Sequence, residues 1–190
     1  NINLLSYLNL VSLATIADVV PLLGLNRAFV KQGLKIFQSR LCLKMFGTHF
    51  KLLDNLNEET IAFHVAPRLN ASGRIESAFL TYQFLTATDP HKIEECIIKM
   101  EAANKERKAL ETIILSSAVQ QISNAESQKP YTLVKAKGWH KGVIGIIASR
   151  LKDLYGGLCV AISIDGDTGH GSIRSTEQID LTEILQELKY

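Results

Sequence analysis

The sequence predicts an α/β fold in which a helical N-terminal portion is followed by a small β-α-β domain. Residues 91–122 carry the longest run of apolar residues at helical spacing, and a helix of about 45 Å can bridge two lobes. From residue 131 onward the pattern changes to strand, glycine-containing turn, helix and strand. A right-handed crossover between parallel strands explains that order, so we expect a small mixed sheet in the C-terminal part only.

Composition leaves the class of partner open. The 190 residues are 46% apolar, enough for one sizeable core or two small ones, and the formal net charge is +2. Any basic surface must therefore come from local placement of Arg and Lys. Three widely spaced cysteines favour neither a metal site nor a disulfide framework and indicate a reducing, cytoplasmic setting. The sequence contains neither a signal peptide nor an apolar stretch long enough to cross a bilayer, so we expect no membrane partner.

Residues 4–20 are strongly apolar, and the front half of this run predicts a buried helix or strand. Asp18 stands alone in this run, shortly before Pro21. A buried carboxylate without a partner costs several kcal/mol, so it needs a cation, a metal or backbone N–H donors. A helix-capping or turn aspartate before proline is the equally supported alternative.

Residues 26–37 predict a helix, and Asn57 is a candidate N-cap for the next one. In residues 66–75, Arg68 and Arg74 bracket what we interpret as a short turn rich in Asn, Ser and Gly. Arginine suits bidentate phosphate contacts, so both are candidates for binding nucleic acid. A surface turn with two solvated arginines is the alternative.

Residues 77–87 predict a short helix, and residues 91–122 the long one. The charged side of the long helix, which includes Glu101 and Lys105, is interpreted as a solvated face rather than a nucleic-acid stripe. Residues 123–130 are polar and typical of a linker.

Residues 131–134, 158–164 and 170–175 are the expected strands, and residues 165–169 form a hairpin-type turn. A Gly-Trp-His-Lys-Gly turn precedes the helix between the first two strands. His140 and Lys141 should therefore lie beside a helix N-terminus, where backbone N–H groups favour an anion.

Ser172 and Arg174 alternate with Ile173, so on a strand they share one face and place a hydroxyl beside a guanidinium. That pair suits a terminal phosphate. His170, like His140 and Asp18, is a further candidate for metal or proton chemistry, although ring packing with one hydrogen bond is the alternative for each histidine. Asp180 is expected to cap the last helix.

Four ordered stretches resemble the RecJ family of the DHH phosphoesterase superfamily, and the resemblance covers essentially the whole chain. The stretches are residues 13–22 (Leu-Ala-Thr-Ile-Ala-Asp-Val-Val-Pro-Leu), 66–74 (Ala-Pro-Arg-Leu-Asn-Ala-Ser-Gly-Arg), 138–151 (Gly-Trp-His-Lys-Gly-Val-Ile-Gly-Ile-Ile-Ala-Ser-Arg-Leu) and 171–175 (Gly-Ser-Ile-Arg-Ser). The family consists of 5′→3′ exonucleases specific for single-stranded DNA. Lys141, where the family has Pro, and Ser72, where Ala is common, are departures.

The resemblance implies that Asp18 is a catalytic ligand of a two-metal site holding Mn²⁺ or Mg²⁺ that residues outside the chain complete. It implies that Arg74 faces the DNA cleft, and that His140, Ser172 and Arg174 hold nucleic acid and its 5′ phosphate. The implied domains are the end of a DHH catalytic domain (1–38), a helical connector (39–124) and a truncated DHHA1-type domain (130–190).

On this interpretation the chain is an excised C-terminal part of a catalytic core, inactive by itself, from a nuclease of bacterial DNA repair and recombination. Expected partners are single-stranded DNA with a 5′ end, a single-strand-binding protein and a helicase. Two alternatives remain: a DHH-family phosphodiesterase for oligoribonucleotides or cyclic dinucleotides, and a non-catalytic nucleic-acid-binding module. The long bridging helix argues against the first alternative, and Asp18 argues against the second.

Overall fold

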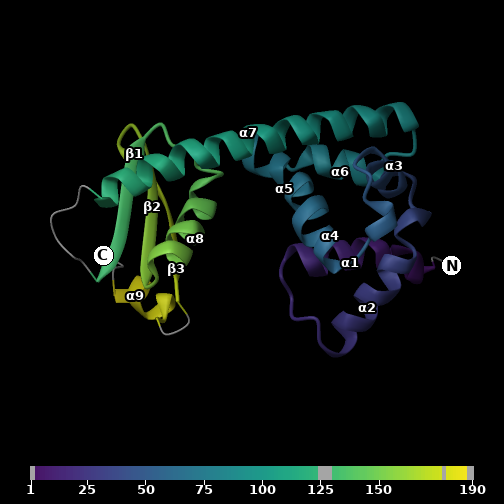
Figure 1. Ribbon diagram of the computed structural model, residues 1–190, viewed down its shortest axis with the longest axis horizontal. Helices are drawn as coiled ribbons and strands as arrows, with labels where there is room; N and C mark the ends of the chain where they lie inside the picture. The colour runs from purple at the N-terminus through teal and green to yellow at the C-terminus, as the bar shows by residue number, and fades with distance from the viewer. Residues whose placement is uncertain (1–2, 124–129, 177–178, 188–190) are drawn as a thin grey trace. The chain divides into compact units, whose positions relative to one another are not determined.

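The computed structural model describes residues 3–123, 130–176 and 179–187 (Figure 1). The predicted α/β class is confirmed, with helices first and a small three-stranded mixed sheet after them. The chain packs into two compact units, one up to Lys105 and one from Glu106 onward, so the division falls within the long helix. The three-part division into residues 1–38, 39–124 and 130–190 stays a prediction.

The first unit is helical. Its elements are η1 (Leu4–Tyr7), α1 (Leu8–Ala17), α2 (Gly24–Lys35), η2 (Phe37–Ser39), α3 (Leu41–His49), η3 (Leu53–Asn55), α4 (Glu58–Thr60), the π-helix η4 (Ile61–Val65), α5 (Ala66–Ile75), α6 (Phe79–Thr86) and the first part of α7 (Pro90–Ser123). Large apolar side chains from α3, α6 and α7, such as Phe46, Phe84 and Ile97, form its core. Burial of such side chains supplies most of the stabilising free energy.

Two predictions for this unit are wrong in part. The front of the apolar run is helical, in η1 and α1, but Leu4 and Leu5 are exposed rather than buried. Residues 66–75 form helix α5 rather than a turn. Helix α5, which contains Pro67, directly follows the π-helix η4, and its residues Leu69 and Ala71 are buried, so packing overrides the turn-like composition. The N-cap prediction is confirmed, because the side chain of Asn57 accepts a hydrogen bond from Thr60 N at 2.8 Å.

The second unit contains the predicted β-α-β arrangement. Its elements after α7 are β1 (Tyr131–Lys137), α8 (Ile144–Tyr155), β2 (Leu158–Asp165), β3 (Thr168–Ser175) and α9 (Leu181–Glu187). β1 pairs parallel with β2, and β2 pairs antiparallel with β3. Helix α8 packs against β2 and β3 (Figure 1). Its residues Ile147 and Leu151 are buried. The linker predicted at 123–130 lies mostly outside the described residues.

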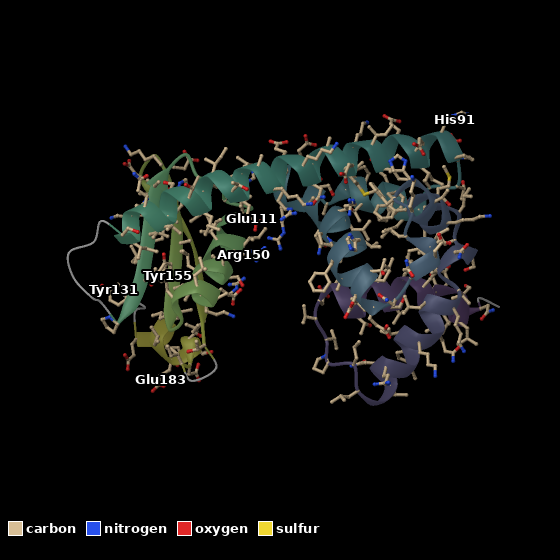
Figure 2. All side chains as sticks on the ribbon, viewed as in Figure 1. His91, Glu111, Tyr131, Arg150, Tyr155 and Glu183 are labelled. Atoms are coloured by element: carbon tan, nitrogen blue, oxygen red, sulfur yellow. The ribbon has the colours of Figure 1, made fainter. Side chains whose placement is uncertain are left out.

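The C-terminal half of α7 is fixed to this sheet by polar contacts. The amide of Gln121 donates to the carbonyl of Lys135 and accepts from its N–H, both at 3.2 Å, so it covers part of the free edge of β1. The carboxylate of Glu111 accepts from Arg107 at 2.8 Å and from Arg150 of α8 at 3.2 Å. Figure 2 shows Arg150 directed from α8 toward Glu111.

Within the described residues, no helix combines the length and the apolar character that a membrane span needs.

Candidate nucleic-acid site

Asp18 follows the last residue of α1, and the expectation that it is buried is wrong, because it is exposed. The helical period explains why. Ile16 of α1 is buried, and a residue two positions further along a helix points about 200° away from it. The backbone N–H of Asp18 donates to Ala14 O at 3.0 Å, so the residue takes the capping place considered as the alternative. Its carboxylate is therefore open to solvent.

The residue after Asp18 is in an unfavourable conformation. Val19 has a φ of +55° and is 86% exposed. Val19 N donates to Ile16 O at 3.1 Å and Val20 N to Thr15 O at 3.0 Å, which is the Schellman helix ending normally built with glycine. A β-branched residue in the left-handed region is a genuine outlier, and such strain is concentrated at functional sites. Lys51 has the same φ at the end of α3, so the strain by itself assigns no function to this corner.

Asp18 does not complete a metal site by itself. Among the described residues, no group of three or more His, Cys, Asp or Glu side chains is arranged to hold a metal ion. Oxygen-ligated divalent cations need several donors, so one carboxylate does not make a site. The described residues alone therefore do not supply enough ligands for a metal that could catalyse hydrolysis.

Arg68, a predicted phosphate ligand, is occupied within the fold. Its Nε donates to Glu101 Oε2 at 2.8 Å, and its Nη1 donates to the carbonyl of His64 at 2.7 Å. The guanidinium also lies 4.3 Å from the ring centroid of Phe50. These contacts give Arg68 a structural role, and phosphate binding by it stays a prediction. Arg74 is exposed in the last turn of α5, and DNA contact by it stays a prediction.

His140 and Lys141 precede α8, as predicted. Gly138 takes a φ of +75°, which lets the chain turn sharply after β1. His140 O accepts from Val143 N at 2.9 Å, and its Nδ1 accepts from Gly142 N at 3.2 Å. An imidazole that accepts through Nδ1 carries its proton on Nε2 when neutral, so Nε2 is a donor. Lys141 is exposed.

Ser163 of β2 anchors this turn and connects it to β3. Its hydroxyl donates to the carbonyl of Trp139, whose side chain is buried. Ser163 pairs with His170 on β3, which is exposed. Sequence reasoning missed Ser163, although a polar residue at an inward position of an apolar strand could have indicated such an anchor.

Ser172 and Arg174 lie over the first turn of α8. A Cβ built on Gly145 would lie 3.4 Å from Ser172 Oγ and 3.7 Å from Arg174 Nη2, so both side chains share the face that the alternation predicts. Arg174 Nη1 donates to Ser172 Oγ at 3.3 Å and to the carbonyl of Ile173 at 2.7 Å. We call this arrangement of the first turn of α8, Ser172 and Arg174 the cradle.

The cradle has the chemistry of an anion site. The N-terminal N–H groups of α8, a guanidinium and a hydroxyl meet at one place, and His140 and Lys141 precede the same helix end. Gly145, which sequence reasoning did not single out, leaves room here, because even a Cβ at this position would be in van der Waals contact with Ser172 Oγ and Arg174 Nη2. Residues 128–190, which include all these groups, match the DHHA1 domain family.

Comparison with known proteins extends this match over nearly the whole chain. The chain is 35% identical over 190 residues to the single-stranded-DNA-specific exonuclease RecJ of Bacillus subtilis, covering 96% of this chain and 24% of that protein. The chain belongs to the RecJ family. This RecJ-family chain thus spans about a quarter of that relative's length.

Crystal structures of RecJ agree with the fold. RecJ from Thermus thermophilus in complex with Mg²⁺ has a TM-score of 0.81 at 27% identity, covering 97% of this RecJ-family chain and 29% of that one. Exonuclease RecJ bound to manganese has a TM-score of 0.79 at 28% identity, covering 96% of this chain and 46% of that one.

Proposed function

We propose that the chain is part of a metal-dependent exonuclease that degrades single-stranded DNA from a 5′ end. The observation that carries this proposal is the cradle, where Ser172 and Arg174 approach Gly145 at the N-terminal turn of α8. The relative in Bacillus subtilis, named as a single-stranded-DNA-specific exonuclease, supports the substrate class.

In this proposal the cradle holds the terminal 5′ phosphate. Charge-assisted hydrogen bonds from a guanidinium are about twice as strong as neutral ones, and the helix N-terminus adds backbone donors and a favourable dipole. Arg174 and Ser172 supply side-chain donors, while Lys141 and His140 Nε2 are available for the neighbouring phosphates. Arg74 is a further proposed contact to DNA.

Asp18 is the proposed ligand for the catalytic metal, and Mn²⁺ or Mg²⁺ is the proposed cofactor, because solved RecJ structures contain these ions. Such a metal activates water and stabilises the charge that develops at phosphorus. One exposed carboxylate is insufficient for this chemistry, so we expect the isolated chain to release no nucleotides. We also propose that the enzyme acts in the cytoplasm, in DNA repair and recombination. Its proposed protein partners are a single-strand-binding protein and a helicase.

The test compares 5′-phosphorylated with 5′-hydroxyl oligonucleotides of one sequence. Arg174→Ala is expected to weaken binding of the phosphorylated strand by about 10-fold, since a hydrogen bond to a charged group contributes about 1.5–3 kcal/mol. Binding of the hydroxyl strand should change much less. Arg27→Ala, at an exposed arginine on α2, is the matched control and should change neither. Equal losses for the two strands would remove the phosphate role.

A further inference from the structure

Two large aromatic rings are exposed side by side on α6. Phe79 is 59% and Tyr82 is 61% exposed, their ring centroids are 5.8 Å apart, and their planes are inclined by only 25°. Aromatic side chains carry large apolar surfaces, and exposed patches of them mark binding surfaces. Phe79 and Tyr82 therefore present a platform on which another flat ring could stack.

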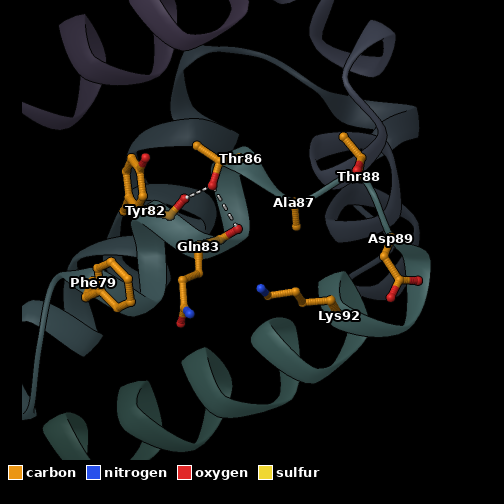
Figure 3. A pocket seen from close by; sticks show the side chains of 8 residues that line it. All are labelled: Phe79, Tyr82, Gln83, Thr86, Ala87, Thr88, Asp89 and Lys92. Carbon is orange, nitrogen blue, oxygen red and sulfur yellow. Dashed lines mark hydrogen bonds between the residues drawn. The ribbon is translucent and has the colours of Figure 1, made fainter.

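The two rings border a cavity of about 340 Å³ beside the first turn of α7 (Figure 3). Gln83 and Lys92 contribute an amide and an ammonium group to its lining. Asp89 also lines it, but its Oδ1 accepts from the backbone N–H of His91 at 3.1 Å, so this carboxylate is engaged at the start of α7. The cavity therefore combines apolar rings, a hydrogen-bonding amide and a cation, at a volume typical of small-ligand sites.

A nucleotide within a single strand matches this combination. Its base has a flat face for the rings and a polar edge for the amide, and its phosphate complements the ammonium group. Stacking on aromatic side chains beside cationic groups is how proteins bind single strands without sequence preference. An apolar peptide or a modified amino-acid residue as the ligand would leave either the ammonium group of Lys92 or the amide of Gln83 without a binding partner.

The platform also adjoins a residue already considered for DNA contact. The end of α5 and the start of α6 are in contact, since a Cβ built on Gly73 would lie 3.3 Å from the Cβ of Ala78. Arg74 and Phe79 are the next residues along the chain from these two. The backbones that carry Arg74 and Phe79 therefore lie close together.

We propose that Phe79, Tyr82 and Lys92 bind a nucleotide of the single strand, with the base stacked on the rings and the phosphate paired with Lys92. This inference rests on the DNA partner proposed above but uses none of the cradle residues.

The first experiment measures binding of the 190-residue chain to a 15-nucleotide oligothymidylate and to an abasic strand with the same phosphates. The wild type should prefer the oligothymidylate by about 10-fold, a typical contribution of base stacking. Phe79→Ala combined with Tyr82→Ala should abolish that preference and leave abasic binding unchanged. Phe63→Ala is the matched control, because Phe63 is 73% exposed on η4 and does not line the cavity. Tyr82→Leu, which keeps apolar bulk, should lose about threefold by itself.

The second experiment tests the cation. Lys92→Gln should weaken binding of both strands and reduce the slope of log K against log salt concentration by about 0.7, the value for one phosphate of a single strand. The stacking role of Phe79 and Tyr82 would be overturned if the double variant kept its preference for the oligothymidylate, or if it lost as much affinity for the abasic strand. Either result would leave the proposal for the cradle unaffected. Failure of the wild type to bind either strand would overturn the DNA partner together with the platform.

Discussion

The cradle and the Asp18 corner, each considered within its own unit, differ in how they are held. The cradle is built from a helix start and a strand that are joined by regular sheet pairing, and Ser172 and Arg174 take the face that strand alternation dictates. The Asp18 corner is a helix ending closed by two backbone hydrogen bonds, with a strained Val19 and an exposed carboxylate. The comparison teaches that the cradle brings several hydrogen-bond donors together within one unit, whereas the corner offers a single exposed carboxylate.

The largest expected effect is that of substituting Arg68. This substitution tests whether Arg68 has a structural role or binds phosphate. Arg68→Ala should lower the free energy of unfolding by about 2–3 kcal/mol, because it leaves Glu101 unpaired at 23% exposure and removes the cation from Phe50. DNA affinity of the remaining folded protein should be unchanged. Denaturant titration and oligonucleotide binding measure the two quantities. A stable variant with weak DNA binding would restore the sequence-based role.

The second effect concerns access to the cradle. Gly145→Leu should place a side chain where Ser172 and Arg174 now approach the helix, and should cost about 2 kcal/mol of preference for a 5′-phosphorylated strand. Binding to the 5′-hydroxyl strand serves as the internal control. Retention of the full preference by a folded Gly145→Leu variant would place the phosphate elsewhere.

The third effect tests strain at the Asp18 corner. Val19→Gly should raise the free energy of unfolding by about 1 kcal/mol, because glycine adopts a φ of +55° without a Cβ clash. Lys51→Gly is a matched comparison, since Lys51 has the same φ at the equivalent ending of α3 but is not β-branched, and its gain should be smaller. Thermal unfolding of both variants decides, and a less stable Val19→Gly protein would refute the strain.

The smallest effect is a pH dependence at α9. Hydrogen bonds from the backbone N–H groups of Thr182 and Glu183 hold the pKa of the Asp180 carboxyl below its usual range. Because the pKa is lowered in the folded state, the stabilisation is present above the unfolded-state pKa and is lost as the pH falls through the folded-state pKa. The amide resonances of Thr182 and Glu183 should shift over that range. Resonances that titrate at the usual aspartate pKa would argue against the cap.

The sequence predicts the second unit well because its contacts are local. Alternation, a glycine turn and a helix period within about 45 residues are enough to predict the β-α-β order and the face that Ser172 and Arg174 share. The first unit depends on contacts distant in sequence. Residues 66–75 form a helix rather than a turn because Leu69 is buried by other parts of the unit. The partner of Arg68, Glu101, lies 33 positions away in the sequence.

The site follows the same division. The residue types at His140, Lys141, Ser172 and Arg174 are readable from the pattern, but the anchoring hydroxyl of Ser163 and the close approach at Gly145 are not, because they depend on packing between elements. Exposure of Asp18 likewise depends on which side of α1 is packed, a fact that an apolar run on all sides of the helix does not reveal.

The most direct measurement is an NMR titration of the chain with a 5′-phosphorylated and a 5′-hydroxyl dinucleotide. The cradle predicts that the amide resonances of Ile144 and Gly145 and the side-chain resonance of Arg174 shift with the phosphorylated ligand and much less with the hydroxyl one. Identical shifts for the two ligands, or shifts confined to other residues, would contradict the claim that α8 and β3 hold the phosphate.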